Sequence, residues 1–142
     1  MKGLFFVHLL SSLMMVGIIW FVQIVHYPLF HQVGQENFTA FEGRHVALTG
    51  YLIAPLMLVE IGTAFLLLGM HEPAISSTFL WINAALLVLI WASTFFIQVP
   101  LHESLSQEYS TTNIQKLVNS NWIRTVLWSI RGGLLIGLMY GK

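Results

Sequence analysis

The chain has 142 residues, of which 56% are hydrophobic and only 8% are charged. Soluble domains usually carry about 25% charged residues, so this composition excludes an ordinary soluble domain and predicts a protein of the lipid bilayer. Six basic residues balance six acidic ones, which leaves no basic surface for nucleic acid. The chain has no cysteine, so disulfides and thiolate metal sites are excluded as well.

Four apolar segments have the length of about 20 residues that a helix needs to cross a bilayer. Helices are expected because lipid offers the backbone no hydrogen-bond partners. The predicted fold is an all-α, transmembrane four-helix bundle that forms a single domain over residues 1–142, with both long connections on one membrane face. The short turn at 70–75 joins the second and third helices on the other face. The predicted spans are 3–25, 46–69, 76–99 and 123–141.

This pattern predicts a multi-pass protein of the cell (inner) membrane. The long-connection side carries Arg44, Lys116 and Arg124, while the other side carries Lys2 and Lys142. That difference is too small for the positive-inside rule to assign the cytoplasmic face.

Two prolines interrupt the apolar pattern near the ends of the first and third spans. Pro28 and Pro100 each free a carbonyl in the preceding turn, which tends to kink or stop a helix. A glutamine and a histidine lie beside each proline, three or four positions apart, so each pair is expected on one helical face. These pairs are Gln23 with His26 and Gln98 with His102.

Glu42 and His45 form an E-x-x-H pair where the second helix opens. Such a pair is one component of carboxylate-bridged metal sites inside helical bundles. Imidazole and carboxylate ligands suit iron, zinc, copper or manganese. The alternative is a polar cluster that holds no metal. The candidate metal ligands are His26, Glu42, His45 and His102, with Glu103 as a second choice for the oxygen ligand.

A polar stripe also runs along the fourth helix, where Asn121, Arg124, Trp128 and Arg131 recur at helical spacing. Arg131 lies about two turns inside the span, where a charge costs at least about 2.5 kcal/mol. It is therefore expected either to pair with Glu60 of the second span or to reach a wet cavity below the histidine cluster. Such a pair would either fix helix packing or serve as an anion or proton site.

Arg124 lies at the membrane boundary, where its guanidinium is expected to hold Glu42, Glu103 or an anionic substrate group. The adjacent pair Gly132 and Gly133 would allow close helix approach. The candidate catalytic residues are His45, His102 and Arg124, and the candidate cofactor-binding residues are Gln98, Asn121 and Arg131.

Residues 98–105 read Q-V-P-L-H-E-S-L, and residues 117–125 read L-V-N-S-N-W-I-R-T. These motifs resemble the C-terminal half of proteins in the anthrone oxygenase-like family, which are small four-helix membrane proteins. The resemblance covers about the last third of the chain and implies oxygen-dependent oxidation of a polycyclic aromatic such as an anthrone. His102 departs from it, because the family usually has asparagine there. The matching positions are Pro100, Leu101, Leu105, Asn121 and Arg124.

Three functions fit these observations. The first is an integral-membrane oxidoreductase, with or without a metal, that acts on an apolar or aromatic substrate and uses histidine for acid–base work. The second is a small module that binds or transports a metal ion, a proton or an anion. The third is a non-catalytic structural subunit. The expected partners are the lipid bilayer, an apolar small molecule and a second copy of the chain.

Overall fold

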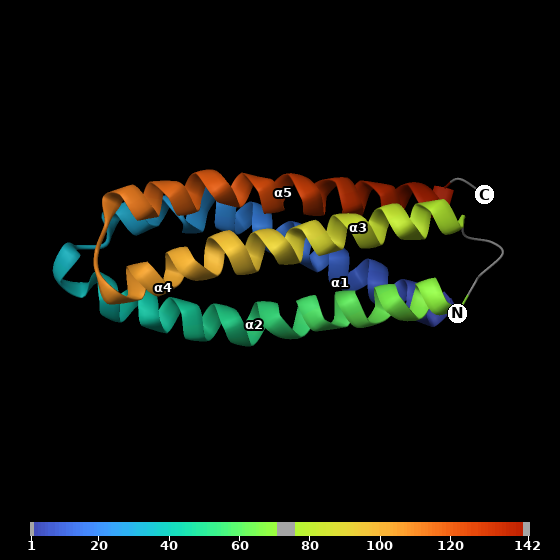
Figure 1. The fold of residues 1–142 in the computed structure, drawn as a ribbon, viewed down its shortest axis with the longest axis horizontal. Coiled ribbons are helices and arrows are strands. Elements are labelled where there is room, and N and C mark those ends of the chain that lie inside the picture. The colour runs from blue at the N-terminus through green and yellow to red at the C-terminus, as the bar shows by residue number, and fades with distance from the viewer. Residues whose placement is uncertain (1, 71–75, 141–142) are drawn as a thin grey trace.

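The computed structural model describes residues 2–70 and 76–140, and every regular element in them is helical (Figure 1). Most of the predicted turn at 70–75 lies outside the described residues. The elements are α1 (Lys2–Phe21), the π-helix η1 (Val22–His26), the 3₁₀-helix η2 (Pro28–Gln32), α2 (Gln35–Gly69), α3 (Ser77–Ser93), the π-helix η3 (Thr94–Gln98), α4 (Val99–Gln107) and α5 (Thr111–Tyr140).

The helices run lengthwise in a four-helix bundle, in which α3, η3 and α4 together form one long rod (Figure 1). α1 packs against α2 and α5, and α3 packs against the same two helices. The chain reverses between η1 and α2 and again between α4 and α5, at the same end of the bundle. We call this the connection end, and we call the end where α1 begins and α5 finishes the terminal end. The predicted fold class is confirmed.

Three helical stretches of the described chain are long and apolar enough to cross a membrane, namely Lys2–Gln32, Gln35–Gly69 and Ser77–Gln107. α5 lies beside them but is not among the three, and its buried polar stripe lowers its mean hydropathy. The exposed side chains of the bundle include many large apolar ones, such as Phe65, Trp81 and Phe96. Such a surface is stable in contact with lipid, so the protein is a membrane protein.

Two of the helices begin before the predicted membrane spans. α2 begins at Gln35 and α5 begins at Thr111, so both extend beyond the membrane spans that were predicted from residues 46 and 123. Ser110 caps α5, because its hydroxyl accepts the backbone N–H of Asn113 at 3.2 Å. Both predicted long connections are therefore mostly helical, and Glu42 and His45 lie within α2.

A π-helical turn precedes each of the two prolines. η1 ends just before Pro28, and η3 ends just before Pro100. A π-turn inserts an additional residue into a helix and therefore rotates everything that follows it, and such turns are frequent at functional sites.

The glutamine and the histidine of each Gln/His pair contact different neighbours. Gln23 accepts a hydrogen bond from α5, and Gln98 donates one to α5. His26 and His102 instead contact side chains of α2. The two histidines therefore meet on the α2 side of the bundle, and the prediction that each pair shares one helical face stays a prediction.

α1 packs closely against α5 at Gly132. A Cβ atom at this position would lie 3.0 Å from Val16 Cγ2, whereas a Cβ at Gly133 would meet nothing within 4 Å among the described residues. The predicted close approach is confirmed at Gly132 only.

Candidate metal centre at the connection end

Polar side chains from three parts of the chain meet at the connection end. α2 supplies Glu42 and His45, which lie one helical turn apart and are both buried. His26 is the last residue of η1, and His102 lies in the first turn of α4. The four predicted metal ligands are thus brought to one place by the fold, and their roles stay predictions.

Glu42 and His102 form the tightest contact of this cluster. Glu42 Oε1 lies 2.5 Å from His102 Nδ1. The Glu42 side chain is fully buried, whereas 15% of the His102 side chain is exposed. The second oxygen, Glu42 Oε2, is also buried and has no hydrogen-bond partner among the described residues. A buried acceptor without a partner costs about 1–3 kcal/mol, so a cation or a donor at this atom would be stabilising.

Tyr27 connects His102 to Arg124. The tyrosine hydroxyl lies 2.9 Å from His102 Nε2, and Arg124 Nη2 donates to the same hydroxyl at 3.3 Å. An ionised Glu42 can only accept, so His102 donates from Nδ1, and Nε2 of the neutral ring accepts from the Tyr27 hydroxyl. The donors therefore all point one way, from Arg124 through Tyr27 and His102 to Glu42.

His45 is held through a single ring nitrogen. Its Nδ1 lies 2.8 Å from His26 Nε2 and 3.1 Å from Thr49 Oγ1. The rings of Phe30 and Phe41 pack around it. In the part of the chain that the structure describes, Nε2 of His45 has no hydrogen-bond partner, which leaves that nitrogen available to a ligand.

Glu42, His45 and His102 each offer one ligand atom, and these three atoms lie within 4.8 Å of one another. Bonds of about 2.0–2.2 Å place the ligand atoms of one metal at most about 4.4 Å apart. Small side-chain rotations would therefore bring the three atoms within reach of a single metal ion. His26 is not one of the three but contacts His45, as an orienting partner of a metal ligand does. Glu103 is exposed and lies outside the set.

The structure corrects the expected partners of Arg124. Its guanidinium donates to Asn121 Oδ1 from Nε at 3.0 Å and from Nη2 at 2.5 Å, in addition to its contact with Tyr27. Among the described residues it contacts neither Glu42 nor Glu103. The physical reason is that Glu42 accepts from His102 and Glu103 is solvent-facing, so neutral acceptors take the guanidinium.

Two predicted cofactor-binding residues take part in helix–helix contacts. Asn121 donates from Nδ2 to Gln23 Oε1 at 2.9 Å. Gln98 accepts from the Ser93 hydroxyl at 3.0 Å and donates to the Ser120 hydroxyl at 3.3 Å. Asn121 is connected to His102 by hydrogen bonds through Arg124 and Tyr27. Gln98 instead forms its hydrogen bonds with side chains of α3 and α5.

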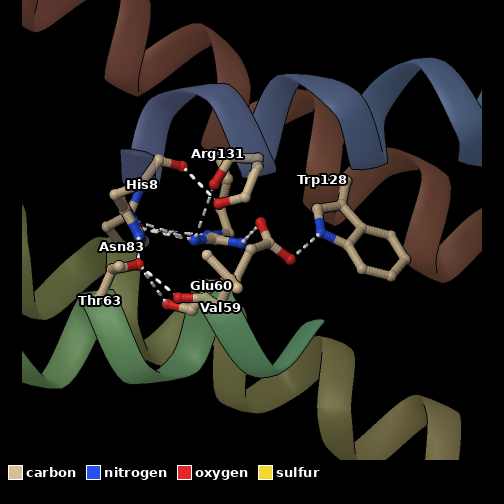
Figure 2. A network of polar contacts seen from close by, with 9 residues as sticks. His8, Val59, Glu60, Thr63, Asn83, Trp128 and Arg131 are labelled. Carbon is tan, nitrogen blue, oxygen red and sulfur yellow. Dashed lines mark hydrogen bonds and ion pairs between the residues drawn. The ribbon is translucent and has the colours of Figure 1, made fainter. Parts of the chain in front are cut away.

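A second buried polar cluster lies toward the terminal end and is centred on Arg131 (Figure 2). Arg131 Nη1 donates to Glu60 Oε1 at 2.7 Å, and both side chains are completely buried. Arg131 also donates to Asn83 Oδ1, and its Nη2 lies 3.3 Å from His8 Nε2. The other Glu60 oxygen accepts from Trp128 Nε1 at 3.1 Å. The predicted Glu60–Arg131 pair is confirmed, and the contacts of Arg131 with His8 and Asn83 extend the cluster to α1 and α3.

An apolar layer separates the two clusters. We call the group formed by His26, Glu42, His45 and His102 the histidine cluster. On each long helix, buried apolar side chains lie between the part near the histidine cluster and the part that contributes to the Arg131 cluster. Arg131, a predicted cofactor-binding residue, is therefore not part of the candidate metal centre. The layer contains Met15, Ile19, Met57, Ile90 and the ring of Trp128, whose indole N–H belongs to the Arg131 cluster.

Sequence reasoning missed two residues of these clusters. Tyr27 reads as a membrane-boundary aromatic, but its side chain is buried and its hydroxyl joins two predicted catalytic residues. Its position between His26 and Pro28 was the available signal. Asn83 interrupts an apolar run, and a lone amide at membrane depth needs a partner.

Together these features define a helical membrane protein with a His/Glu polar site at one end of its bundle. Comparisons of the chain with family models, with curated proteins and with solved structures find no match.

Proposed function

We propose that the protein is an integral-membrane, metal-dependent oxidoreductase that acts on an apolar or aromatic substrate. The observation that carries this proposal is the group formed by Glu42, His45 and His102, next to a buried carboxylate oxygen without a partner. Two imidazoles and one carboxylate form the donor set that is typical of non-haem iron(II) oxygenases. Iron is therefore the metal we propose first, ahead of zinc, copper and manganese.

The surroundings of the two histidines support a metal. Histidines that bind metals almost always donate the other ring N–H to a fixed partner. With a metal on His102 Nδ1, Nε2–H would donate to the Tyr27 oxygen. With a metal on His45 Nε2, Nδ1–H would donate to His26 Nε2. Both partners are already at 2.8–2.9 Å.

The resemblance to the anthrone oxygenase-like family points to the same class of reaction, in which dioxygen accepts electrons from an aromatic substrate. Two of its matching positions, Asn121 and Arg124, lie in the hydrogen-bonded chain that ends at His102. We assign Arg124 the role of holding Tyr27, and through it the orientation of His102.

A metal-free oxidoreductase is the second candidate, and the short Glu42–His102 contact favours it. A carboxylate at 2.5 Å from an imidazole fixes the orientation of the ring, which a general base requires. Such a base would take a proton from a phenolic or anthrone-like substrate before oxygen reacts with it.

The apolar layer argues against a transport module, because an ion crossing the bundle would have to pass it without polar partners. For the Arg131 cluster we propose a packing role. Its charges already have partners within the bundle, which is the arrangement a purely structural pair requires.

Metal content tests the proposal directly. The protein would be purified gently in detergent from iron-supplemented cells, and its metals measured together with those of His45→Ala and His102→Ala. His31→Ala is the matched control, because His31 is an exposed histidine of the same end of the bundle. We expect about one iron per chain in the wild type and the control and a strong loss in the other two variants. A wild type that neither retains metal nor takes up iron(II) on titration contradicts the metal centre.

Oxygen uptake separates the two candidates. With an anthrone as the substrate, chelation should abolish uptake if a metal carries the reaction. Uptake that persists in the chelated protein and disappears in His102→Ala would instead support the metal-free base.

A further inference from the structure

A hollow of about 570 Å³ opens beside the candidate metal centre. One wall is His26, and the remainder is one face of α2 between Asn37 and Thr49. Sites for small molecules usually measure about 300–1,000 Å³, so the hollow is large enough for a ligand.

The inner wall of this hollow is part of the metal centre. His45 lines the hollow and is also one of the three candidate ligands. His26, on the opposite wall, contacts Nδ1 of the His45 ring through its own Nε2. A molecule in the hollow would therefore lie next to the metal position, whereas Glu42 and His102 do not line it.

The lining is apolar along most of its length and cationic at one place. Phe41 and Leu48 provide the apolar surface, and the Phe41 ring lies nearly parallel to that of His45. α2 begins at the connection end and runs toward the terminal end, so Asn37 is nearest the connection end and Leu48 lies deeper along the bundle.

Arg44 is the charged group of the hollow. Its side chain is exposed, and among the described residues no carboxylate pairs with it. A guanidinium binds a carboxylate through two parallel hydrogen bonds, and Asn37 lies two turns earlier on the same face as an additional donor. A hollow with a mostly apolar lining and one unpaired guanidinium is complementary to a molecule with an apolar body and a negative charge, that is, to an anionic amphiphile.

We propose that this hollow binds the substrate, and that the substrate is an anionic amphiphile. Its carboxylate pairs with Arg44, and its apolar or aromatic body lies along Phe41 and Leu48 beside His45. The inference rests on the proposed function for the fate of the bound molecule, whereas binding itself requires no metal.

Photolabelling in nanodiscs of phosphatidylcholine tests this assignment. The probes are a photoactivatable laurate and the matched lauryl alcohol, used with a chelator present, and labelled residues are identified by mass spectrometry. We expect the acid to label residues 37–49, and we expect labelling to fall about tenfold with the alcohol and in Arg44→Gln, the loss of one charge-assisted pair. Lys116→Gln is the control, since Lys116 lines a separate hollow of about 610 Å³ on the α4–α5 side.

Equal labelling by acid and alcohol overturns the assignment, as does labelling that Arg44→Gln leaves unchanged or that Lys116→Gln reduces equally. Loss of labelling when phosphatidylglycerol replaces part of the phosphatidylcholine also overturns it, because the occupant is then bulk anionic lipid. The chelator keeps the two proposals distinct. Labelling of a protein that never binds metal supports the hollow and removes only the metal centre, whereas metal binding without labelling does the reverse.

Discussion

Replacing Glu60 with leucine should unfold the protein far more easily than the loss of an ordinary hydrogen bond would. The substitution removes the only carboxylate that pairs with Arg131 among the described residues, and it leaves the guanidinium fully buried. It also takes away the acceptor of the Trp128 indole N–H. Asn83 Oδ1 stays in contact with Arg131, but a neutral acceptor does not compensate a full charge.

The expected loss is about 3–5 kcal/mol, the usual cost of leaving one partner of a buried ion pair uncompensated. An average hydrogen bond between membrane helices contributes only about 0.6 kcal/mol, so the two cases are easy to tell apart. Replacing both partners with apolar residues of similar volume, in Glu60→Leu with Arg131→Met, removes the buried charge altogether. The double variant should recover to within about 2 kcal/mol of the wild type.

The assay is a titration of the protein in dodecyl maltoside with sodium dodecyl sulfate, followed by tryptophan fluorescence, for the wild type, both single variants and the double variant. A coupling energy of at least about 4 kcal/mol is expected from this cycle, because the two single losses sum to at least about 6 kcal/mol and the double variant loses at most about 2 kcal/mol. A loss of only about 0.6 kcal/mol in Glu60→Leu, or a double variant whose loss equals the sum of the singles, would refute the reasoning. Metal content at the connection end should stay unchanged throughout.

Four further substitutions test other parts of the structure. Tyr27→Phe removes the hydroxyl that fixes His102, and it should weaken iron binding about 10–100-fold in a competition titration while thermal stability changes little. Gly132→Val places a side chain against Val16 and should cost about 1–3 kcal/mol, whereas Gly133→Ala, which meets open space, should stabilise its helix by about 0.5–1 kcal/mol; thermal unfolding measures both. Ser110→Ala removes the cap of α5 and should cost about 1 kcal/mol in the same assay, and an unchanged midpoint would contradict the capping role.

The architecture follows from the sequence because the bilayer restricts the choices. Long apolar runs have to be helical, and a charge inside them has to find a partner on another helix. Only Glu60 lies within another predicted span, so the partner of Arg131 could be named from the sequence. The E-x-x-H pair likewise places Glu42 and His45 on one face of any helix.

The contacts of Tyr27 and Arg124 could not be derived in this way. Both depend on the π-turns, which add a residue to a helix and rotate His26, Tyr27 and His102 relative to the preceding span. A proline indicates a break but not the size of this rotation. Helical spacing alone therefore left Tyr27 among the aromatic residues of the membrane boundary.

The apolar layer separates the part of the bundle that stabilises helix packing from the part that holds the candidate site. This layer, which includes Met15, Ile19, Met57 and Ile90, lies between the Glu60–Arg131 pair and the histidine cluster at the connection end. No side chain of the described residues belongs to both clusters. Free energies of substitution at two such distant groups usually add. The connection end can therefore accumulate changes in ligands or in the hollow while the Arg131 cluster continues to hold the helices in place. A mutational library confined to Phe41, Arg44, Leu48 and Thr49, which line the hollow, should consequently alter binding there with little loss of folded protein.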